Sequence, residues 1–309
     1  MQSQNGIILN EILIEISHNC NLSCNMCGFG RHINKYDSSK FMNLDNFFNI
    51  FLKIKNNTQS IRLNGRGESV IHKDFITIFE YVYQEKIPIN LFTNLSFHKQ
   101  KIIDVFKKTE PQLYISIDSP YKYNLEKIRV GANFEFILDN LSNLQTLNKR
   151  PFIVFTLQDE NYHEIEAICD FALKYRCNLI YNVLRKNNGI ESFQKIIIKN
   201  LDPIKKAFLN IQKQYQNTNL TVLTPNQISG INIFYTNTTC GTKDKCPKIR
   251  NELCILYDGS VIPCNMFNPY KLGNIYDQSL EEILSSKELS LFETNHKEND
   301  YCKNCACLV

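Results

Sequence analysis

The stretch Glu11–Cys27, EILIEISHNCNLSCNMC, joins a short apolar run to three closely spaced cysteines. Cys20, Cys24 and Cys27 have the spacing C-x3-C-x2-C and follow directly on a segment that reads as a β-strand. Three thiolates on one short loop can hold three irons of a 4Fe–4S cluster and leave the fourth iron without a protein ligand. Such an open iron can bind a small molecule, so the spacing indicates a site for chemistry more than for electron storage.

Two other interpretations of this loop are a zinc site and a chance cluster of thiols. Structural zinc sites usually pair two C-x2-C hooks or add histidines. His18 could contribute a nitrogen ligand, but the sequence has no second hook near the three cysteines. The iron–sulfur interpretation is therefore favoured.

The cysteine loop resembles the signature of the radical S-adenosylmethionine (SAM) enzymes, although Met26 replaces the aromatic residue that often precedes the third cysteine. The resemblance implies a SAM-binding 4Fe–4S cluster held by Cys20, Cys24 and Cys27, with SAM bound at the open iron. It also implies the reaction. Reduction of the cluster cleaves SAM, and the resulting 5′-deoxyadenosyl radical abstracts a hydrogen atom from a C–H bond of the substrate.

Composition places the chain among ordinary globular proteins. It has 309 residues, 43% hydrophobic content and a net charge of +4 without a dense basic block, so nothing favours nucleic-acid binding. It has no apolar run of about 18 residues and no secretory signal at the N-terminus, so we expect no membrane partner and a cytoplasmic location. Its 12 cysteines are then better read as reduced, metal-binding thiols than as disulfides.

Short apolar runs alternate with segments of helical periodicity. The predicted strands are Glu11–Ser17, Ser60–Asn64, Pro88–Thr93, Gln112–Asp118, Phe152–Leu157 and Asn178–Val183. The apolar stripes between them are Phe47, Phe48, Phe51 and Ile54; Ile137, Leu138, Leu141 and Leu144; and Ile165, Ile168, Ala172 and Leu173. This alternation predicts an α/β fold with a parallel sheet and helices outside it.

A partial (β/α)6 TIM-like barrel fits this pattern and is the fold that the resemblance implies. A further helix is expected over residues 200–216 and a short strand over Asn219–Leu223. After about residue 235 cysteine, glycine and proline become dense and the regular alternation stops. We therefore expect a barrel over residues 1–225 and a smaller cysteine-rich domain over residues 226–309. Parallel α/β folds place their chemistry at the carboxyl ends of the strands.

The second predicted strand ends in Leu63–Ser69, LNGRGES, which resembles the glycine-rich GGEP segment of the family. In that segment the backbone approaches the amino group of SAM. Gly65 and Gly67 would permit the approach because they lack a Cβ, and Glu68 also matches the pattern. Arg66 and Ser69 depart from it, and a plain tight turn is the alternative.

Further polar residues near the ends of the next strands are implied by the resemblance to reach SAM or substrate: Thr93, Asn94, Ser116, Asp118, Arg129 and Asn161. Arg129 suits the SAM carboxylate, because a guanidinium group can bind a carboxylate through two parallel hydrogen bonds. A solvated surface arginine is the alternative for Arg129. Helix capping is an equally good account of Asn161.

Near the C-terminus Cys246 and Cys264 are separated by twelve residues, Gly259 and four further residues, and Cys302-x2-Cys305 follows a helix predicted from Ser279 to about Lys287. This arrangement resembles the SPASM and shorter twitch extensions of radical SAM enzymes. The full C-x2-C-x5-C-x3-C run of SPASM domains is missing, which favours the twitch form. Cys246, Cys264, Cys302 and Cys305 would hold one auxiliary 4Fe–4S cluster. Zinc is the alternative, and Cys240 could replace one of the four ligands.

The remaining cysteines have several readings. Cys254 and Cys240 are candidate hydrogen-atom donors to a substrate radical, as in related epimerases, or buried thiols without a catalytic role. Cys307 is also spare. Cys169 and Cys177 are expected to be structural, since free cysteine packs as a small apolar side chain.

The sequence supports three functional hypotheses. The first is oxidation or epimerisation of a compact substrate such as a sugar, aminocyclitol or metabolite, because the barrel begins too early to be preceded by a leader-peptide recognition domain. The second is maturation of a ribosomally made peptide (RiPP) by epimerisation or crosslinking. The third is a non-enzymatic zinc- or cluster-binding protein, which would not explain the open iron. For an enzyme, the expected partners are a small-molecule or peptide substrate and a flavodoxin- or ferredoxin-type reductant.

Overall fold

The computed structural model describes residues 7–29, 37–183, 202–223, 246, 248–264, 269–299 and 302. These residues form two compact units. The first unit contains the described residues up to Cys20, those from 37 to Leu91 and those from 246 onward. The second unit contains the described residues from Asn21 to 29 and from Phe92 to 223. The predicted domain boundary between 225 and 226 lies outside the described residues.

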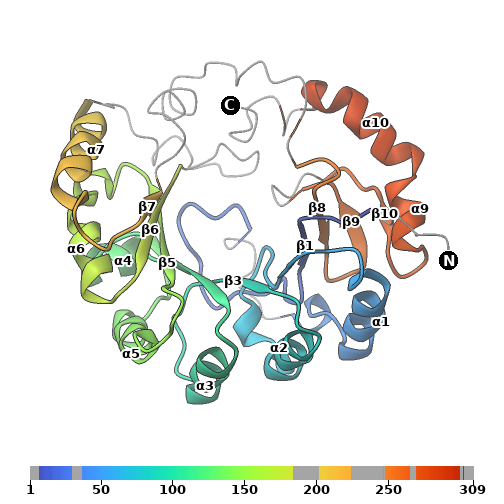
Figure 1. Ribbon diagram of the computed structural model, residues 1–309, viewed down its shortest axis with the longest axis horizontal. Coiled ribbons are helices and arrows are strands. Elements are labelled where there is room, and N and C mark those ends of the chain that lie inside the picture. Colours follow the sequence, from blue (N-terminus) through green and yellow to red (C-terminus); the bar gives the residue numbers. More distant parts are fainter. Residues whose placement is uncertain are drawn as a thin grey trace. The chain divides into compact units, whose positions relative to one another are not determined.

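The first unit is built on a mixed sheet with the strand order β10-β9-β8-β1-β2-β3. Its strands are β1 (Glu11–Ile14), β2 (Ile61–Arg62), β3 (Ile89–Thr93), β8 (Glu252–Ile255), β9 (Ser260–Ile262) and β10 (Gly273–Asn274), and the last two residues of β3 belong to the second unit. β1 pairs in parallel with both β2 and β8, whereas β8, β9 and β10 are antiparallel to one another (Figure 1). The β-hairpin of the cysteine-rich segment therefore shares a sheet with β1.

All four residues of β1 are buried, and the strand is hydrogen-bonded to a neighbour on each side. Leu13 packs in an apolar cluster with Cys254, Leu256 and Ile262 of the C-terminal hairpin region. The one charged residue of β1, Glu11, forms an ion pair with Arg62 of β2, so its carboxylate is not buried without a partner.

The helices of the first unit are η2 (Ser38–Lys40), α1 (Leu44–Ile54), η3 (Ser69–Ile71), α2 (Phe75–Gln84), α9 (Leu280–Leu284), α10 (Lys287–Asn295) and η6 (His296–Glu298). α1 buries the predicted stripe, except that Ile50 takes the place of Phe48. The helix predicted from Ser279 to about Lys287 corresponds to α9, and α10 is a second helix that the sequence analysis did not predict. The second helix starts because the Ser286 side chain accepts a hydrogen bond from the Leu289 N–H and so forms a new N-cap.

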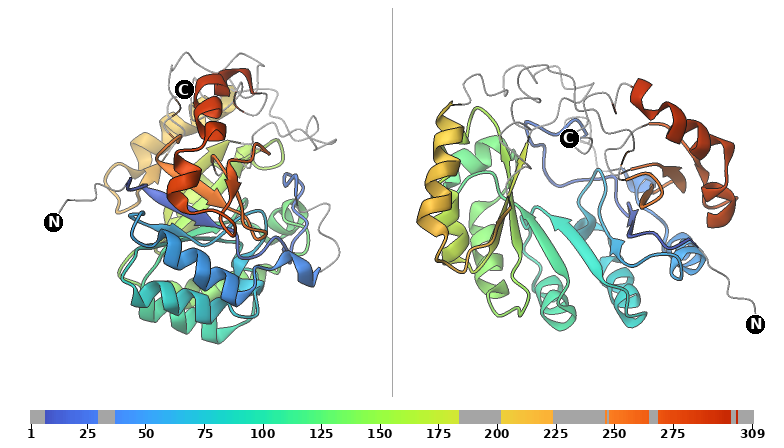
Figure 2. Two further views of the ribbon diagram at one scale, coloured as in Figure 1. Left: turned by 90° about the vertical axis from the view of Figure 1, so that its right-hand side faces the viewer. Right: turned by 45° about the horizontal axis from the view of Figure 1, so that its top comes forward.

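The second unit contains parallel strands in the order β4-β5-β6-β7. They are β4 (Gln112–Ser116), β5 (Phe152–Leu157), β6 (Asn178–Val183) and β7 (Val222–Leu223), and the helices are α3 (Gln100–Thr109), α4 (Lys122–Ile128), α5 (Phe134–Leu144), η4 (Tyr162–Glu164), α6 (Ala167–Lys174) and α7 (Asp202–Tyr215). Figures 1 and 2 show α3, α5, α6 and α7 along one face of these strands. The predicted βα alternation and parallel pairing are confirmed, with β4 and β7 shorter than expected.

The two faces of β4, β5 and β6 carry different side chains. Ile153, Phe155 and Leu157 of β5 are buried, and Phe155 contacts Tyr181 of β6 at a ring distance of 5.7 Å. The hydroxyl of Tyr181 bonds to the Ile165 carbonyl just before α6, so this face is the one that the helices cover. Because side chains alternate along a strand, the intervening residues of β5 face away from the helices.

The face of the second unit that points away from the helices changes character along the strands. At its amino end Tyr114 stacks on Phe92 and on Phe152, at ring distances of 4.4 and 5.7 Å. At its carboxyl end Thr156 of β5 is in register with Asn182 of β6. Aromatic rings therefore close the amino end of this face, and polar groups line its carboxyl end, where parallel α/β folds bind ligands.

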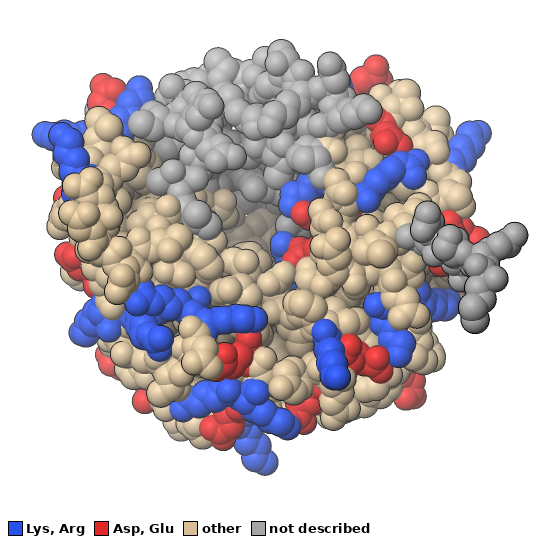
Figure 3. Space-filling model, viewed as in Figure 1, with Lys and Arg blue, Asp and Glu red and all other residues tan. Residues whose placement is uncertain are grey.

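The surface carries charges of both signs. On the face shown in Figure 3, Lys and Arg side chains are interspersed with Asp and Glu side chains. Among the described residues, no helix is both long enough and apolar enough to cross a membrane.

Lys53 connects α1 with the segment before α9 inside the first unit. Its ammonium group donates to the carbonyl oxygens of Ile275 at 2.6 Å and Gln278 at 3.1 Å. Three donors on one flexible stem suit a cluster of main-chain acceptors, and hydrogen bonds from a charged donor are stronger than neutral ones.

Replacing Lys53 by Met should lower the free energy of unfolding by about 1–2 kcal/mol, because the carbonyls of Ile275, Tyr276 and Gln278 lose a charged donor. Lys55→Met is the matched control. Lys55 makes a partly exposed ion pair with Glu85 at 3.0 Å, and such pairs contribute only about 0–1 kcal/mol. Urea unfolding of both variants measures the difference. Equal losses would contradict the role assigned to Lys53.

Candidate active site

The cysteine loop starts where β1 ends, and the first unit fixes its beginning. The Ser17 hydroxyl donates to the Asn19 carbonyl at 2.9 Å. The Asn19 side chain in turn donates to the Asp37 carbonyl at 2.9 Å and accepts from the Asp37 N–H at 3.1 Å. Main-chain bonds add to these, because the His18 N–H donates to the Lys40 carbonyl at 2.9 Å and Ser17 forms an antiparallel bridge with Phe41.

The glycine-rich segment after β2 packs directly against this part of the chain. A Cβ on Gly67 would lie 2.1 Å from the Asn19 carbonyl oxygen, and the Glu68 N–H donates to that same oxygen at 2.8 Å. A Cβ on Gly65 would lie 2.4 Å from Cγ of Glu15. Both glycines are therefore required by close approach, although the contacting group is the protein's own chain. The predicted contact with SAM stays a prediction.

Glu15, at the end of β1, is a fully buried carboxylate of the first unit. It accepts a hydrogen bond from the Arg66 N–H at 2.7 Å and lies 3.1 Å from Nδ1 of His18. His18, which the zinc interpretation would use as a ligand, is therefore engaged by Glu15 through that nitrogen.

The second unit fixes the rest of the cysteine loop through its main chain. Ser23 N–H donates to the Val130 carbonyl at 2.8 Å, and Asn25 N–H donates to the Ile128 carbonyl at 2.9 Å. These bonds attach the residues on either side of Cys24 to the end of α4. Cys24 is only 8% exposed, which makes it the most buried of the three loop cysteines.

The turn after β3 contains the predicted Thr93–Asn94 pair and contacts the same loop. Thr93 and Asn94 accept hydrogen bonds from the N–H groups of Leu95 and Ser96, at 3.1 and 2.8 Å. Asn94 also donates to the Asn21 side chain at 2.9 Å, and Asn21 donates to the Ser96 carbonyl at 2.9 Å. Both predicted residues therefore hold the turn and the loop together.

Asn140 of α5 also positions this turn, and the sequence analysis did not select it. Its side chain is 4% exposed and donates to the carbonyls of Leu95 at 3.0 Å and Phe97 at 2.7 Å. Leu95 has a left-handed backbone with φ 56°, a strained conformation that needs such support. The available signal was an asparagine on the apolar stripe of a predicted helix.

Asp118 and Arg129 form a buried ion pair beside Cys24. The Arg129 Nε lies 2.7 Å from the Asp118 Oδ2, and the two side chains are 9% and 0% exposed. Arg129 Nη1 lies 3.9 Å from the Cys24 sulfur, and the Thr156 N–H donates to Asp118 at 2.7 Å. Arg129 is thus not a solvated surface arginine, and Asp118 directs its guanidinium group.

Burial and this ion pair act in opposite directions on the ionisation of the site. Burial raises the pKa of Asp118, while Arg129 and the Thr156 N–H lower it. Burial also raises the pKa of the Cys24 thiol to about 11, against the effect of Arg129. Metal ligation needs the thiolate, so binding iron at Cys24 must release a proton. The guanidinium group of Arg129 favours the charged thiolate form of Cys24.

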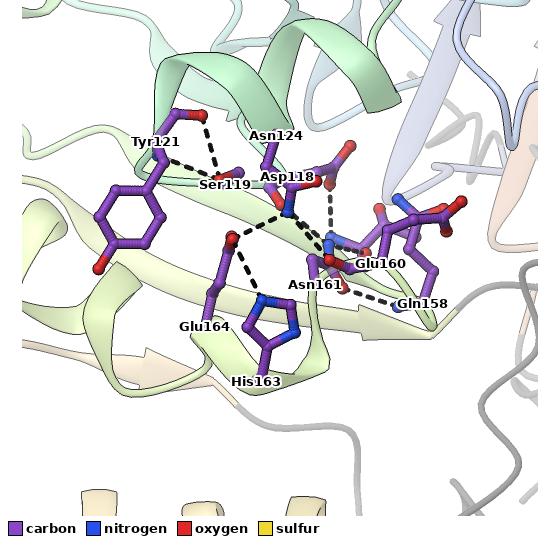
Figure 4. A network of polar contacts seen from close by, with 10 residues as sticks. Asp118, Ser119, Tyr121, Asn124, Gln158, Glu160, Asn161, His163 and Glu164 are labelled. Carbon is purple, nitrogen blue, oxygen red and sulfur yellow. Dashed lines mark hydrogen bonds and ion pairs between the residues drawn. The ribbon is translucent and has the colours of Figure 1, made fainter.

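Asn161 connects the carboxyl ends of β4 and β5, as Figure 4 shows at the centre of the polar network. It is fully buried and donates to the carbonyls of Asp118 and Thr156, each at 2.9 Å. It also accepts from the Gln158 N–H at 2.9 Å. Although Asn161 precedes η4, its side chain makes no capping bond, so the capping interpretation is wrong. Ser116 is half-buried at the end of β4.

The cysteines of the C-terminal segment are described in part. Cys246, Cys264 and Cys302 are half-buried, while Cys305, Cys307 and Cys240 lie outside the described residues. Cys254 is 1% exposed in an apolar cluster, and its burial raises the pKa of the thiol well above the ordinary value. This setting favours the packed-thiol interpretation of Cys254, and its role as a hydrogen donor stays a prediction.

Cys169 and Cys177 are buried, as predicted for structural thiols. The Cys169 sulfur lies 3.2 Å from the Tyr181 hydroxyl, and burial raises the pKa of Cys169 to about 11 and of Cys177 to about 12. Neutral thiols of this kind pack as apolar groups and react slowly.

Within the described ranges no three side chains of His, Cys, Asp or Glu are close enough together to hold a metal ion. The donor set itself fits an iron–sulfur cluster, because Cys20, Cys24 and Cys27 supply three soft thiolate ligands within one loop. A guanidinium group 3.9 Å from the most buried of these thiols would compensate its negative charge.

Comparison with protein families identifies two domains. Residues 14–172 match the model of the radical SAM superfamily, and residues 246–306 match the SPASM iron-sulfur cluster-binding domain. The chain therefore belongs to the radical SAM superfamily, whose members are enzymes, and it carries a C-terminal iron–sulfur domain. Both predicted resemblances are confirmed, and with them the SAM and 4Fe–4S cofactors.

Two similar proteins have names that indicate different activities. The chain is 24% identical over 268 residues to GTP 3′,8-cyclase of Helicobacter pylori, covering 83% of this chain and 80% of the relative. It is 22% identical over 332 residues to the tungsten-containing aldehyde ferredoxin oxidoreductase cofactor-modifying protein of Pyrococcus furiosus, covering 96% and 86%.

Among solved structures, SuiB of Streptococcus suis with bound SAM superposes with a TM-score of 0.74 at 16% identity, covering 97% of this chain and 72% of SuiB. SuiB bound to its precursor peptide SuiA gives a TM-score of 0.73. This likeness shows that the two proteins share a fold, and it confirms the predicted α/β architecture of a partial barrel with an iron–sulfur extension.

Replacing Asn140 by Leu should lower the free energy of unfolding by about 2–4 kcal/mol, because two buried carbonyls lose their donor. Asn143→Leu on the same helix is the control, since the Asn143 amide bonds only to the exposed Asp139 carbonyl at 3.0 Å. It should change stability by less than about 0.5 kcal/mol. Similar losses for the two variants in urea unfolding would rule out the role of Asn140.

Gly67→Ala should lower the free energy of unfolding by about 2 kcal/mol or more, because the new Cβ meets a main-chain oxygen that cannot rotate away. Gly65→Ala should cost less, since its new Cβ meets side-chain atoms of Glu15. Urea unfolding ranks the two variants. A larger loss for Gly65→Ala would show that the approach at Gly67 is not the tighter constraint.

Proposed function

We propose that this enzyme abstracts a hydrogen atom from a C–H bond of a peptide substrate and that oxidation or epimerisation of that carbon follows. The observation that carries the proposal is the arrangement around Cys24. A thiol of the three-cysteine loop lies 3.9 Å from Arg129, whose guanidinium group is directed by the buried Asp118. One buried cation, Arg129, therefore contacts both Cys24 of the cluster loop and Asp118 after β4.

The residues of the loop would hold the first cluster. Cys20, Cys24 and Cys27 would bind three of its irons as thiolates. Arg129 would bind the carboxylate of SAM through its remaining N–H groups, because Asp118 occupies the Nε side. When bound, the cluster and SAM supply the 5′-deoxyadenosyl radical that takes the hydrogen atom.

The other residues proposed to contact SAM would act mainly by positioning. The side chains of Asn94 and Asn161 are engaged in bonds within the protein, and those of Thr93 and Asp118 accept main-chain hydrogen bonds. The further candidates are Gly65, Gly67, Glu68 and Ser116. All of these residues would hold the main chain around SAM in a fixed arrangement. A site that is ordered in advance needs no reorganisation during the reaction.

The C-terminal cysteines Cys246, Cys264, Cys302 and Cys305 would hold an auxiliary 4Fe–4S cluster. Such a cluster could accept an electron from the substrate radical if the reaction is an oxidation. A flavodoxin- or ferredoxin-type protein would supply the electron for SAM cleavage. If the reaction is an epimerisation, Cys254 or Cys240 would supply the hydrogen atom, and the burial of Cys254 then favours Cys240.

Two observations bear on the class of substrate. The likeness to SuiB, a protein with a solved precursor-peptide complex, supports a peptide. The names of the two curated relatives, a GTP cyclase and a cofactor-modifying protein, support the compact substrate that the sequence first suggested. We prefer the peptide because SuiB bound to its precursor peptide superposes with a TM-score of 0.73, and because the polar end of the second unit bears amide groups.

Cys24→Ala should abolish SAM cleavage, because removal of one thiolate leaves the cluster without its third ligand. The measurement is 5′-deoxyadenosine formed by anaerobically reconstituted, dithionite-reduced protein. Cys169→Ala is the control, since this buried thiol of α6 lies outside the loop. Retained cleavage in Cys24→Ala, or equal loss in both variants, would contradict the proposed radical SAM site.

A further inference from the structure

Gln158 follows directly on β5 and has a buried amide whose polar atoms are not used. The residue is 0% exposed, and within the described part of the protein neither its Nε2 nor its Oε1 has a hydrogen-bond partner. Buried amides are almost always bonded, because leaving one unbonded costs about 1–3 kcal/mol. A group that retains this cost points to a ligand that completes its bonds.

The main chain of Gln158 is fixed, so its side chain is held in one region. Its N–H donates to the Asn161 side chain at 2.9 Å. Its carbonyl accepts from the N–H groups of Asn161 and Tyr162, each at 3.1 Å. Asn161 is itself bonded to the Asp118 carbonyl at the end of β4. In Figure 4, Gln158 and Glu160 lie at one end of this network, and His163 and Glu164 lie at the other.

The position of Gln158 along the chain places it on the face of β5 that the helices do not cover. Ile153, Phe155 and Leu157 are buried on the helix side. Gln158 continues the alternate set that includes Thr156, which is in register with Asn182 of β6. This face is polar at its carboxyl end, where parallel α/β folds bind their ligands.

We propose that Gln158 recognises an amide group of the peptide substrate, an inference that rests on the function proposed above. A primary carboxamide presents a donor and an acceptor side by side. A ligand that completes the bonds of Gln158 must supply one acceptor for its Nε2 and one donor for its Oε1. The C=O and N–H groups of a peptide main chain supply both. Gln158 is therefore a specificity-determining residue, and the ligand class is a peptide amide.

Gln158→Met tests this assignment, because methionine fills a similar volume without the amide. The probe is N-acetylglycine N-methylamide, observed by saturation-transfer NMR on reconstituted, SAM-loaded protein. The probe should bind wild-type protein, and Gln158→Met should weaken binding about tenfold through the loss of two hydrogen bonds. The same variant should melt about 2 °C or more higher, because an unbonded buried amide is removed.

The matched control is Gln100→Met on α3, where the exposed amide bonds only to the Asp104 side chain at 2.8 Å. It should leave probe binding and melting temperature at wild-type values. Binding that is equal in wild type and Gln158→Met, no binding to wild type, or a lower melting temperature for Gln158→Met would overturn the assignment.

Formation of 5′-deoxyadenosine by the wild-type protein is measured in parallel. If it forms while the probe fails to bind, the amide assignment alone is wrong. If it does not form, the proposed function is wrong.

Discussion

The buried ion pair between Asp118 and Arg129 is the interaction on which the candidate active site at the carboxyl ends of β4 and β5 depends. Two charges removed from water are tolerated only when each satisfies the other, so their geometry is strongly constrained. Asp118 also takes the Thr156 N–H of β5, and Arg129 reaches the sulfur of Cys24. One electrostatic requirement thereby fixes the end of β4, its distance from β5 and the position of the cysteine loop.

Amide side chains, all of them buried except that of Asn21, stabilise the main chain of the loops. Asn21, Asn94, Asn140 and Asn161 each donate to groups of the loops that follow the strands. Loops lack the ladder bonds of a sheet, and their buried N–H and C=O groups must find other partners. Gln158 differs from these four residues because its amide bonds remain available. The four asparagines therefore hold the site together, whereas Gln158 is the residue that we propose to bind a ligand.

Much of the fold could be predicted from the sequence. The apolar runs of β1, β5 and β6 and the stripe on α1 reflect local periodicity, and the structure confirms them. The role of Asn161 could not be predicted, because its partners are main-chain carbonyls at the ends of β4 and β5. Asn140 was missed for the same reason, since its acceptors lie in a different turn of the chain. A residue type alone does not reveal which group it will face.

The sequence by itself determined the alternation of strands and helices, the three-thiol loop and the cofactors that the loop implies. These properties depend on the spacing of residues along the chain, and this spacing is visible in the sequence itself. Only the tertiary structure decided that β8 joins β1, that Asp118 directs Arg129 toward Cys24, and that Gln158 is buried without a partner. Each of these depends on segments distant in sequence packing together, and burial then determines which polar groups must pair.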